Sequence, residues 1–288
     1  MSNKYWVWLS SINNLSLDII YKLLERYKEP EKIWYLDKKD LERLDINKEN
    51  INKILDIYYK QNIDNVMFYI KKNNIKVISI NDKEYPESLK RIYDPPIVLY
   101  ANGNLNLLNH KSIAIVGCRL CSVYGKIITK KLAYNLSEKN ITIISGMARG
   151  IDTYAHIGAL EAKGRTIAVL GSGIDVIYPK ENERLYYEII KNNGLIISEY
   201  IIGTKPIPIN FPKRNRIISA LSSGVLVTEA KIRSGSFITV DFALEQGKEI
   251  FAVPGNINSV NSEGTNSLIK QVAKLVTSVD DILDELIL

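Results

Sequence analysis

Apolar residues follow one spacing at the start of the chain and a different one later. In residues 1–75 they recur every three or four positions, as Leu15, Ile19 and Leu23 do, which is the spacing of one face of an α-helix. Charged residues of both signs lie between them. The pattern predicts a small helical domain over residues 1–75, and the mixed charge argues against a dedicated DNA-binding surface there.

From residue 113 on, short apolar runs alternate with helical stretches. The runs predict strands at Ile113–Val116, Ile141–Ile144, Thr166–Leu170, Leu195–Ile197, Val225–Val227 and Ile250–Val253. Such an alternation favours a doubly wound, mostly parallel sheet with helices on both faces. We therefore expect an α/β domain over residues 111–288. Sheets of this kind bind ligands at the carboxyl ends of their strands, so the loops after the strands are the expected site.

Residues 76–110 join the two parts. A short strand is expected from Val77 to Ile80, and the Pro95-Pro96 pair cannot lie inside a helix or a central strand. We expect this segment to be an ordered connector packed on the α/β domain.

Composition restricts the class of protein only loosely. Of the 288 residues, 46% are hydrophobic and 24% are charged, as in ordinary globular proteins. The 38 Lys and Arg residues exceed the 32 Asp and Glu residues and give a net charge of +6, which permits a nucleic-acid partner without specifying one. No apolar run is long enough for a membrane span, and Trp6–Leu9 is too short for a signal peptide. We expect a cytoplasmic protein with no membrane partner.

The two cysteines, Cys118 and Cys121, form a C-x-x-C pair. Zinc usually takes four ligands, but no second cysteine pair is present, and His110 and His156 lack ligand spacing. We expect no metal site. A thioredoxin-like pair would lie at a helix start after a strand, roughly where this one is, yet Arg119 and the glycine-rich loops favour another use of the loop.

The densest group of cations lies in the hexapeptide from Phe211 to Arg216. An apolar run beginning at Ile217 follows it, so the cations are expected at a helix start, where unpaired backbone N–H groups also favour anions. Pro212 suits a first-turn position, and Phe211 can stack on a base. The alternative for the hexapeptide alone is a solvated helix start with Phe211 in the core.

Loops rich in Gly, Ser or charge follow the predicted strands. They are Gly117-Cys118-Arg119, Ser145 to Asp152, Gly171-Ser172-Gly173 and Ser234-Gly235-Ser236. Glycines let backbone N–H groups approach a phosphate, although each loop alone is also typical of a plain strand-to-helix turn. None is a complete dinucleotide or P-loop fingerprint, so neither NAD nor ATP is expected.

Acidic residues also gather near the strand ends. They are Asp152, Asp175, Glu199 and Glu229. Carboxylates at such positions can support metal-assisted hydrolysis. The cations of the same loops instead favour ion pairs, with Arg149, Arg214 or Arg216 as partners.

Together these segments resemble the DprA/Smf family of DNA-processing proteins. The matching motifs are Tyr85-Pro86, Asp94-Pro95-Pro96, Ile115-Val116-Gly117 with Arg119, Ser145 to Asp152, Ala155-His156, Ala159-Leu160, Tyr178-Pro179, Ser198-Glu199, Phe211 to Arg216, Glu229-Ala230, Ser234-Gly235-Ser236, Pro254-Gly255 and Gly264-Thr265-Asn266. So many motifs in one order make a chance match improbable.

The resemblance implies an extended Rossmann-like domain behind a small helical domain of the SAM-like or helix-hairpin-helix-like type. It implies a protein with neither enzymatic activity nor cofactor that binds single-stranded DNA, protects incoming strands and helps load the RecA recombinase during natural transformation and DNA recombination. His156 is then a structural helix residue. Many family members carry a C-terminal winged helix, and we expect none here because the sequence ends at Leu288.

The resemblance also implies a DNA-binding site. Its residues would be Gly117, Arg119, Ser145, Gly146, Met147, Ala148, Arg149, Gly150, Phe211, Lys213, Arg214, Asn215, Arg216, Ser234, Gly235 and Ser236. The family usually has a small hydroxyl residue at the position of Cys118, which makes that thiol a packing substitute.

A homodimer is expected as well, because family members resembling this chain pair through the end of the Rossmann-like domain. Leu268, Ile269 and Val272 lie on one predicted helical face, and a second apolar stripe runs from Val279 to Ile287. A self-complementary apolar patch suits a two-fold interface. The alternative is that both stripes cover the edge of the sheet within one chain.

The alternative function is a nucleotide-cleaving hydrolase on a related sheet, similar to the cytokinin-activating phosphoribohydrolases. Those enzymes carry a P-G-G-x-G-T loop, whereas the corresponding regions here are Arg233–Ser236 and Pro254-Gly255-Asn256. The departure from that loop favours binding over catalysis.

Overall fold

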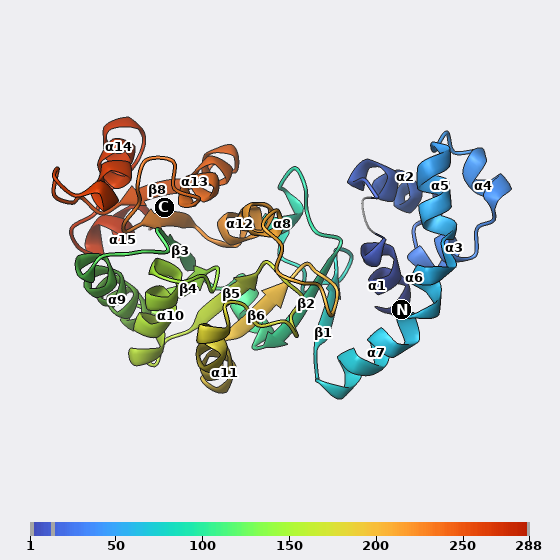
Figure 1. The fold of residues 1–288 in the computed structure, drawn as a ribbon, viewed down its shortest axis with the longest axis horizontal. Helices are drawn as coiled ribbons and strands as arrows, with labels where there is room; N and C mark the ends of the chain where they lie inside the picture. The colour runs from blue at the N-terminus through green and yellow to red at the C-terminus, as the bar shows by residue number, and fades with distance from the viewer. Residues whose placement is uncertain (1–2, 13–14, 287–288) are drawn as a thin grey trace.

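Short helices build the N-terminal part of the computed structural model, which describes residues 3–12 and 15–286 (Figure 1). They are α1 (Asn3–Ser11), α2 (Leu17–Tyr27), α3 (Pro30–Trp34), α4 (Lys38–Glu42), α5 (Lys48–Leu55), α6 (Ile57–Gln61) and α7 (Ile63–Lys72). Asp37 and Asn47 start α4 and α5, because each side chain accepts a hydrogen bond from the backbone N–H three residues later. Within the described ranges, no helix combines the length and apolarity needed to cross a lipid bilayer.

A nine-stranded sheet forms the rest of the fold within the described residues. Its strands are β1 (Lys76–Ser79), β2 (Val98–Gly103), β3 (Ser112–Val116), β4 (Thr142–Ser145), β5 (Thr166–Leu170), β6 (Leu195–Ser198), β7 (Gly224–Val227), β8 (Glu249–Ala252) and β9 (Lys274–Leu275). The order across the sheet is β1-β2-β6-β5-β4-β3-β7-β8-β9. Neighbours from β6 to β9 are parallel, whereas β2 runs antiparallel to both β1 and β6. The predicted fold class is confirmed.

Helices cover both faces of the sheet (Figure 1). One face carries α8 (Glu87–Lys90), α12 (Asn210–Leu221), α13 (Ser236–Glu245) and α14 (Glu263–Gln271). The other carries α9 (Val123–Glu138), α10 (Ile151–Glu161), α11 (Glu183–Lys191) and α15 (Asp280–Leu286). Short 3-10 turns are η1 (Leu105–Asn109), η2 (Lys180–Asn182) and η3 (Val260–Ser262).

Strand β3 shows why apolar runs predicted the sheet so well. Ala114 and Val116 lie in the core beneath α12, and Ile113 and Ile115 lie in the core beneath α9. A strand buried on both faces needs an unbroken apolar run. The six predicted strands accordingly correspond to β3 through β8, with ends that differ by a residue or two.

The segment predicted as a connector contributes two strands to the sheet. β1 and β2 pair with each other, and β2 also pairs with β6. The loop between them is held by Tyr85, whose buried hydroxyl donates a hydrogen bond to the Pro96 carbonyl at 2.6 Å. β1 confirms the short strand predicted at Val77–Ile80 to within a residue, whereas β2 was not predicted, and both strands belong to the sheet itself.

The N-terminal helices share a hydrophobic core with one face of the sheet. Trp8 of α1 is fully buried and lies in the same cluster as Tyr100 of β2 and Ile196 of β6. The hydroxyls of Ser10 and Tyr100 lie 3.3 Å apart. Helix α1 is therefore fixed against the sheet.

The C-terminal apolar stripes lie largely inside the chain. Leu268 of α14 is 4% exposed and Ile269 packs against the same core, whereas Val272 is 51% exposed. Ile282 of α15 is fully buried, and Ile287 lies outside the described residues. The prediction of Leu268 as a dimer contact needs correction, because its side chain is covered by its own sheet.

Candidate nucleic-acid interface

A cavity of about 390 Å³ opens at the carboxyl ends of β3 and β7. β3 pairs with β4 on one side and with β7 on the other, so the strand order reverses at this point. Gly117 follows β3, Ser234 follows β7, and both line the cavity. Open parallel sheets bind ligands at such a reversal. We call this space the switch-point cavity.

Two helices begin at the switch-point cavity. Phe211 and Pro212 come from the first turn of α12, and Ser236 is the first residue of α13. Gly235, at the cap position of α13, supplies no side-chain cap. First-turn N–H groups carry partial positive charge and attract anions. The cavity is therefore suited to phosphate groups.

Arg214 forms the floor of the cavity and is 3% exposed. Its guanidinium donates to the carbonyls of Gly146 and Val169, and its Nε donates to the Asn215 side chain at 3.2 Å. Burial lowers the pKa of Arg214 to about 10, so the group remains charged at neutral pH. Its Nη1 donors tie α12 to the ends of β4 and β5, while its place in the predicted DNA-binding site stays a prediction. Its charge still contributes to the field in the cavity.

A buried carboxylate organises the loop that follows β4. Asp152 accepts hydrogen bonds from the N–H groups of Gly146 and Ala148 at 3.0 and 3.3 Å. Burial raises the pKa of Asp152, and the charge of Arg214 and these two hydrogen bonds oppose that rise. The loop amides predicted to approach a phosphate therefore serve a carboxylate of the same chain.

Gly150 is required where the loops after β3 and β4 touch. Its φ is +77°, and a side chain there would collide with the carbonyls of Cys118 and Arg119. Only a glycine permits this approach. The contact holds the base of Arg119 at the edge of the switch-point cavity.

His156 lies one turn beyond Asp152 on α10 and is fully buried. Its Nδ1 is 2.7 Å from the hydroxyl of Thr166, which donates its own proton to the Ile143 carbonyl. Nδ1 must therefore be the donor, and Nε2 has no partner within the described residues. Burial, with a smaller effect of Arg214, lowers the pKa of His156 to about 3. The imidazole is neutral and structural.

The rim of the cavity carries a ladder of alternating cations and rings. The Arg119 guanidinium lies 5.5 Å from the centroid of Phe211, and the Phe211 and Tyr178 centroids are 5.5 Å apart. The Arg149 guanidinium lies 6.0 Å from the centroid of Tyr178. Both arginines are exposed and both rings are half-buried. Cations over aromatic faces hold the planar groups in place, and such surfaces stack bases.

Tyr178 is a rim residue that the sequence-based site did not include. It belongs to the loop after β5 and meets Phe211 only because α12 packs beside that loop. Nothing local in the sequence assigns this ring to a site. The Tyr178-Pro179 motif shared with the family is the one signal that could have included it.

Arg149 already has a carboxylate partner on the rim. Its Nε and one terminal nitrogen donate to Glu181 at 3.1 and 2.6 Å. Hydrogen bonding raises the pKa of Arg149 and lowers that of Glu181. Glu181 was not among the carboxylates expected to pair with the arginines, and a DNA phosphate would have to compete with it.

Lys213 and Arg216 face away from the switch-point cavity. Residues three apart on a helix share a face, and these two line a separate cavity between α12 and α1. Both terminal nitrogens of Arg216 donate to Glu199, at 2.8 and 2.6 Å, which confirms one predicted ion pair. The prediction that Lys213 and Arg216 share one DNA-binding site with Phe211 and Arg214 needs correction, because the helix divides the hexapeptide between two cavities.

The structure brings together part of the predicted site. The predicted residues that line the switch-point cavity are Gly117, Arg119, Ala148, Phe211, Arg214, Asn215, Ser234, Gly235 and Ser236. Those behind or beside it are Ser145, Gly146, Met147, Arg149, Gly150, Lys213 and Arg216. The Ser145 hydroxyl donates to the Ile115 carbonyl, and Met147 is fully buried, so both act structurally.

Cys118 packs against a buried carboxylate. Its sulfur lies 3.6 Å from Glu229 Oε2, which also accepts the Ser122 N–H at 2.8 Å. Burial and the charge of Glu229 raise the pKa of Cys118 to about 12. A thiol that stays protonated is a poor nucleophile. Within the part of the chain that the structure describes, no group of three or more His, Cys, Asp and Glu residues could hold a metal.

The fold and the cavity define a class: a Rossmann-like α/β protein with a cationic ligand cavity at its topological switch point. A family model described as DNA recombination-mediator protein A matches residues 76–287. The chain belongs to this family.

Two named relatives match most of this chain. The chain is 49% identical to DNA processing protein DprA of Streptococcus pneumoniae over 207 residues, which are 72% of this chain and 73% of the relative. It is 36% identical to Protein Smf of Escherichia coli over 286 residues, 99% of this chain and 75% of the relative. The X-ray structure of the S. pneumoniae protein superposes with a TM-score of 0.85 at 39% identity, covering 99% of this chain and 98% of that one.

A structure from Helicobacter pylori is also similar, with a TM-score of 0.66 and 33% identity over 73% of this chain and 95% of that chain. That structure describes the single-stranded DNA binding mode of DNA processing protein A.

Proposed function

We propose that this chain binds single-stranded DNA at the switch-point cavity, protects incoming strands and helps load RecA during natural transformation, in the cytoplasm and without a cofactor. The ladder of Arg119, Phe211, Tyr178 and Arg149 carries the proposal. It offers stacking surfaces and exposed guanidinium groups side by side, which is the combination that single strands require. The binding mode described for the H. pylori relative supports the same partner.

A titration with labelled oligo-dT over a range of salt concentrations tests the proposal. Binding to a single strand releases counterions, with a slope of roughly −0.7 in log–log form for each neutralised phosphate. A cavity that uses a few cations is expected to give a slope of about −2 to −4.

The matched duplex is the control for strand selectivity. Stacked and paired bases cannot lie on the rings of Phe211 and Tyr178, so we expect much weaker duplex binding. Equal affinity for duplex and single strand would contradict a site built on base stacking.

The proposal is for binding and not for catalysis. Incubation with nucleoside monophosphates and Mg²⁺, followed by analysis for released base, tests the alternative hydrolase. Sustained release of base would mean that hydrolysis, and not binding, is the primary function.

We also propose that two copies pair through the β9 end of the sheet. Val272 and Leu275 are 51% and 44% exposed there, and β9 is the last strand in the sheet order. Exposed apolar side chains beside the open edge of a sheet are a favourable surface for self-association. Two linked sites would raise affinity for a long strand through effective concentration.

Light scattering of the wild type and of Val272→Arg and Leu275→Arg tests the pairing. We change Val272 and Leu275 and leave the predicted contact Leu268 intact, because a charge at the buried Leu268 would disrupt the core. A dimeric wild type and folded monomeric variants with reduced long-strand affinity are expected. A wild type that is monomeric at micromolar concentration would contradict the dimer.

A further inference from the structure

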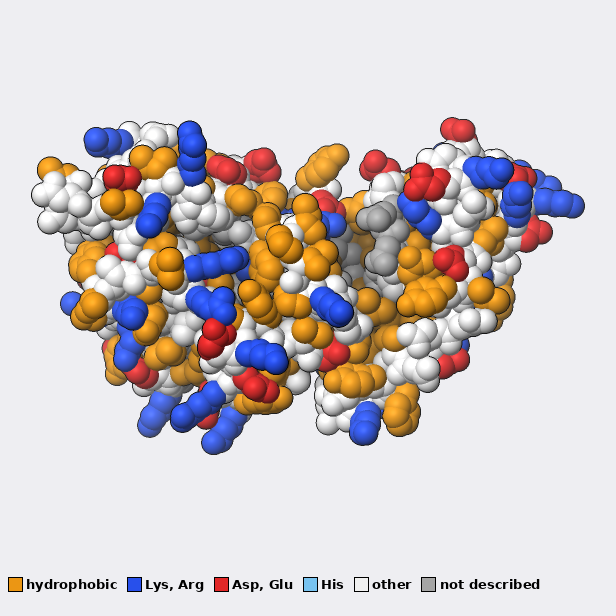
Figure 2. All heavy atoms as spheres, viewed as in Figure 1, with side chains coloured by type: hydrophobic (Ala, Val, Ile, Leu, Met, Phe, Trp, Pro, Cys, Tyr) orange, Lys and Arg blue, Asp and Glu red, His pale blue; other side chains and the backbone are white. Residues whose placement is uncertain are grey.

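Glu229 places a buried negative charge beside the switch-point cavity. It lies two residues after the end of β7 and is 2% exposed, and its backbone carbonyl accepts the Cys118 N–H at 2.8 Å. Gly117 and Arg119, on either side of Cys118, line the cavity. Figure 2 shows Lys and Arg side chains at the surface between α10 and α12. A carboxylate near a site for phosphate repels that ligand, so its presence there needs another reason.

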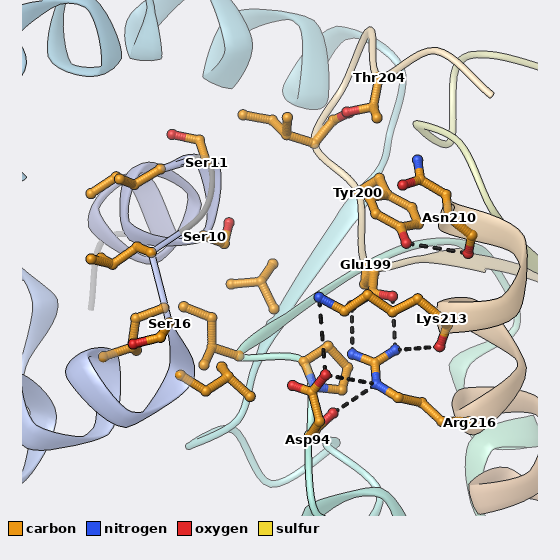
Figure 3. Close-up of a pocket in the computed structure, with 18 of the residues that line it drawn as sticks. Ser10, Ser11, Ser16, Asp94, Glu199, Tyr200, Thr204, Asn210, Lys213 and Arg216 are labelled. Carbon is orange, nitrogen blue, oxygen red and sulfur yellow. Dashed lines mark hydrogen bonds and ion pairs between the residues drawn. The ribbon is translucent and has the colours of Figure 1, made fainter. Parts of the chain in front are cut away.

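Other carboxylates expected at the strand ends have partners outside the loop that follows β3. Figure 3 shows Glu199 against Arg216, and the two side chains are 2.6 Å apart. Asp175 accepts the Gly203 N–H at 2.9 Å. Among the described residues, Glu229 forms no ion pair. The donors to its carboxylate come instead from the stretch of chain between β3 and α9.

Two residues of this stretch hold the carboxylate of Glu229. The Ser122 N–H and hydroxyl donate to its two oxygens at 2.8 and 2.5 Å, and the Cys118 sulfur lies 3.6 Å from Oε2. Hydrogen bonds to a carboxylate are stronger than those between neutral groups. We call residues 118–122 the Arg119 loop. Both of its ends are therefore fastened to Glu229.

Gly125 is required for the same contact. A side chain at this position would collide with Glu229 Oε2, whereas glycine leaves room for the carboxylate. The Gly125 N–H also donates to the Ser122 hydroxyl oxygen at 3.0 Å, which caps α9. Glu229 therefore joins the end of β7, the Arg119 loop and the first turn of α9.

The Arg119 side chain depends on this loop for its position. Among the described residues it forms no hydrogen bond or ion pair, and its guanidinium lies against the ring of Phe211, 5.5 Å from the centroid. An exposed, long side chain loses rotamer freedom when a ligand orders it, so a backbone that is already fixed lowers the cost of binding. A clamp on the loop backbone therefore prepares Arg119 for a phosphate.

We infer that Glu229 is a positioning residue for strand binding: it touches no DNA and holds the Arg119 loop so that Arg119 lies against Phe211 and can meet a phosphate. The effect on DNA rests on the proposed function, whereas the effect on the loop does not. The charge and the clamp act in opposite directions. Removal of Glu229 strengthens binding if only its charge matters and weakens binding if the clamp matters, so the sign of the change decides.

Fluorescence anisotropy of labelled oligo-dT with Glu229→Ala tests the inference in the full chain. Binding is expected to weaken about tenfold, and the salt slope is expected to flatten by roughly 0.7, as for Arg119→Ala. Thr228→Val is the matched control, because it removes a buried hydrogen bond of 2.6 Å to Thr129 of α9 and leaves the clamp intact. It should bind like the wild type. Wild-type or stronger binding by Glu229→Ala would overturn the inference.

A double-mutant cycle separates positioning from a general loss of structure. In the Arg119→Ala background, Glu229→Ala is expected to change affinity by less than about twofold, because the group that it positions is gone. In the Arg149→Ala background it should still weaken binding about tenfold. An equal loss in both backgrounds would mean that Glu229 acts on the fold as a whole and not through Arg119.

Hydrogen exchange measured by mass spectrometry follows the loop without DNA. Peptides that cover the Arg119 loop should exchange faster in Glu229→Ala than in Thr228→Val, while peptides from β4 to β6 exchange as in the wild type. Unchanged exchange in the loop would refute the clamp. A wild type that binds no oligo-dT would refute the proposed function, and hydrogen exchange would still decide whether Glu229 holds the loop.

Ser122→Ala covers the case in which Glu229→Ala does not fold. It keeps the carboxylate and removes the shorter of the two hydrogen bonds from Ser122, so oligo-dT binding should weaken about threefold. Ser122→Thr keeps the hydroxyl and should bind like the wild type. Full affinity in Ser122→Ala would show that the clamp does not control Arg119.

Discussion

The floor and the rim of the switch-point cavity use the same residue types for opposite purposes. On the floor, Arg214 is buried and donates to backbone carbonyls of its own chain. On the rim, Arg119 is exposed and contacts Phe211 through the face of the ring. The floor arginine holds the fold together, whereas the rim arginine keeps its N–H groups available. Burial and the identity of the hydrogen-bond acceptors decide the role of a cation at this site.

The two regions also differ in how they respond to pH and salt. Floor groups are desolvated, so changes there are expected to alter stability. Rim groups are in water, so changes there are expected to alter binding and its dependence on salt.

The largest effect is expected from Arg214→Ala, which should lower the free energy of unfolding. The change leaves two buried carbonyls without their donor and removes the buried positive charge that acts on Asp152, and removal of one member of a buried charged network costs about 3–5 kcal/mol. Urea unfolding followed by circular dichroism measures the loss. Arg119→Ala is the rim control, with a change of about 0.5 kcal/mol or less. If Arg214→Ala were as stable as the wild type, the floor and the rim would not differ in their contribution to stability.

Removal of either rim ring is expected to weaken binding of oligo-dT. Phe211→Ala and Tyr178→Ala each lose the stacking of a base, about 1–3 kcal/mol, with little change of salt slope. Tyr178→Phe keeps the ring and is the matched control. Fluorescence anisotropy with short oligo-dT measures the effect. Full affinity in Tyr178→Ala would remove that residue from the site.

Stability should also depend on pH through the buried His156, which lies one turn beyond Asp152 on α10. Its folded-state pKa of about 3 lies below the usual value of 6.5, so the unfolded chain binds the proton more readily. Stability from this group is complete above pH 6.5 and decreases as the pH falls toward 3. At pH 5 the loss relative to pH 8 is about 2 kcal/mol.

His156→Gln supplies the reference for that measurement. Asp152, whose raised pKa acts in the opposite direction, is present in both proteins and largely cancels in the comparison. Urea unfolding at several pH values should show a steeper decrease in the wild type. Parallel curves would mean that the imidazole is not desolvated in the folded state.

On the rim, Arg119→Ala is expected to flatten the salt dependence of oligo-dT binding by roughly 0.7, the share of one phosphate. Arg119→Lys keeps the charge and should keep the slope. A slope unchanged in Arg119→Ala would show that this guanidinium contacts no phosphate.

The smallest effect on oligo-dT binding is expected from Glu181→Gln. This change should strengthen binding, whereas removal of a rim ring weakens it. Its carboxylate holds the exposed Arg149 at 2.6 Å, and water screens exposed ion pairs. Release of Arg149 should strengthen binding of oligo-dT by about fivefold or less. Weaker binding in this variant would mean that Glu181 positions Arg149 for the strand.

Local patterns in the sequence were sufficient for the central strands β3 to β8 and for the place of the site along the chain. A central strand of a parallel sheet is buried on both faces, so its signal is an apolar run that any window of the sequence contains, as in Thr166–Leu170. Polar loops after those strands lie at one edge of the sheet whatever the packing of the helices. This is why Gly117, Arg119 and Ser234–Ser236 were predicted together and lie around one cavity.

The direction of individual side chains was decided only by the tertiary structure. The hexapeptide carries three cations within four residues, yet the packing of α12 turns Arg214 toward backbone carbonyls and Lys213 toward α1. Tyr178 reaches Phe211 from a different loop, and Leu268 is covered by a sheet formed from distant strands. These outcomes depend on contacts between segments far apart in the chain, and local spacing carries no information about which face of a helix such contacts will bury.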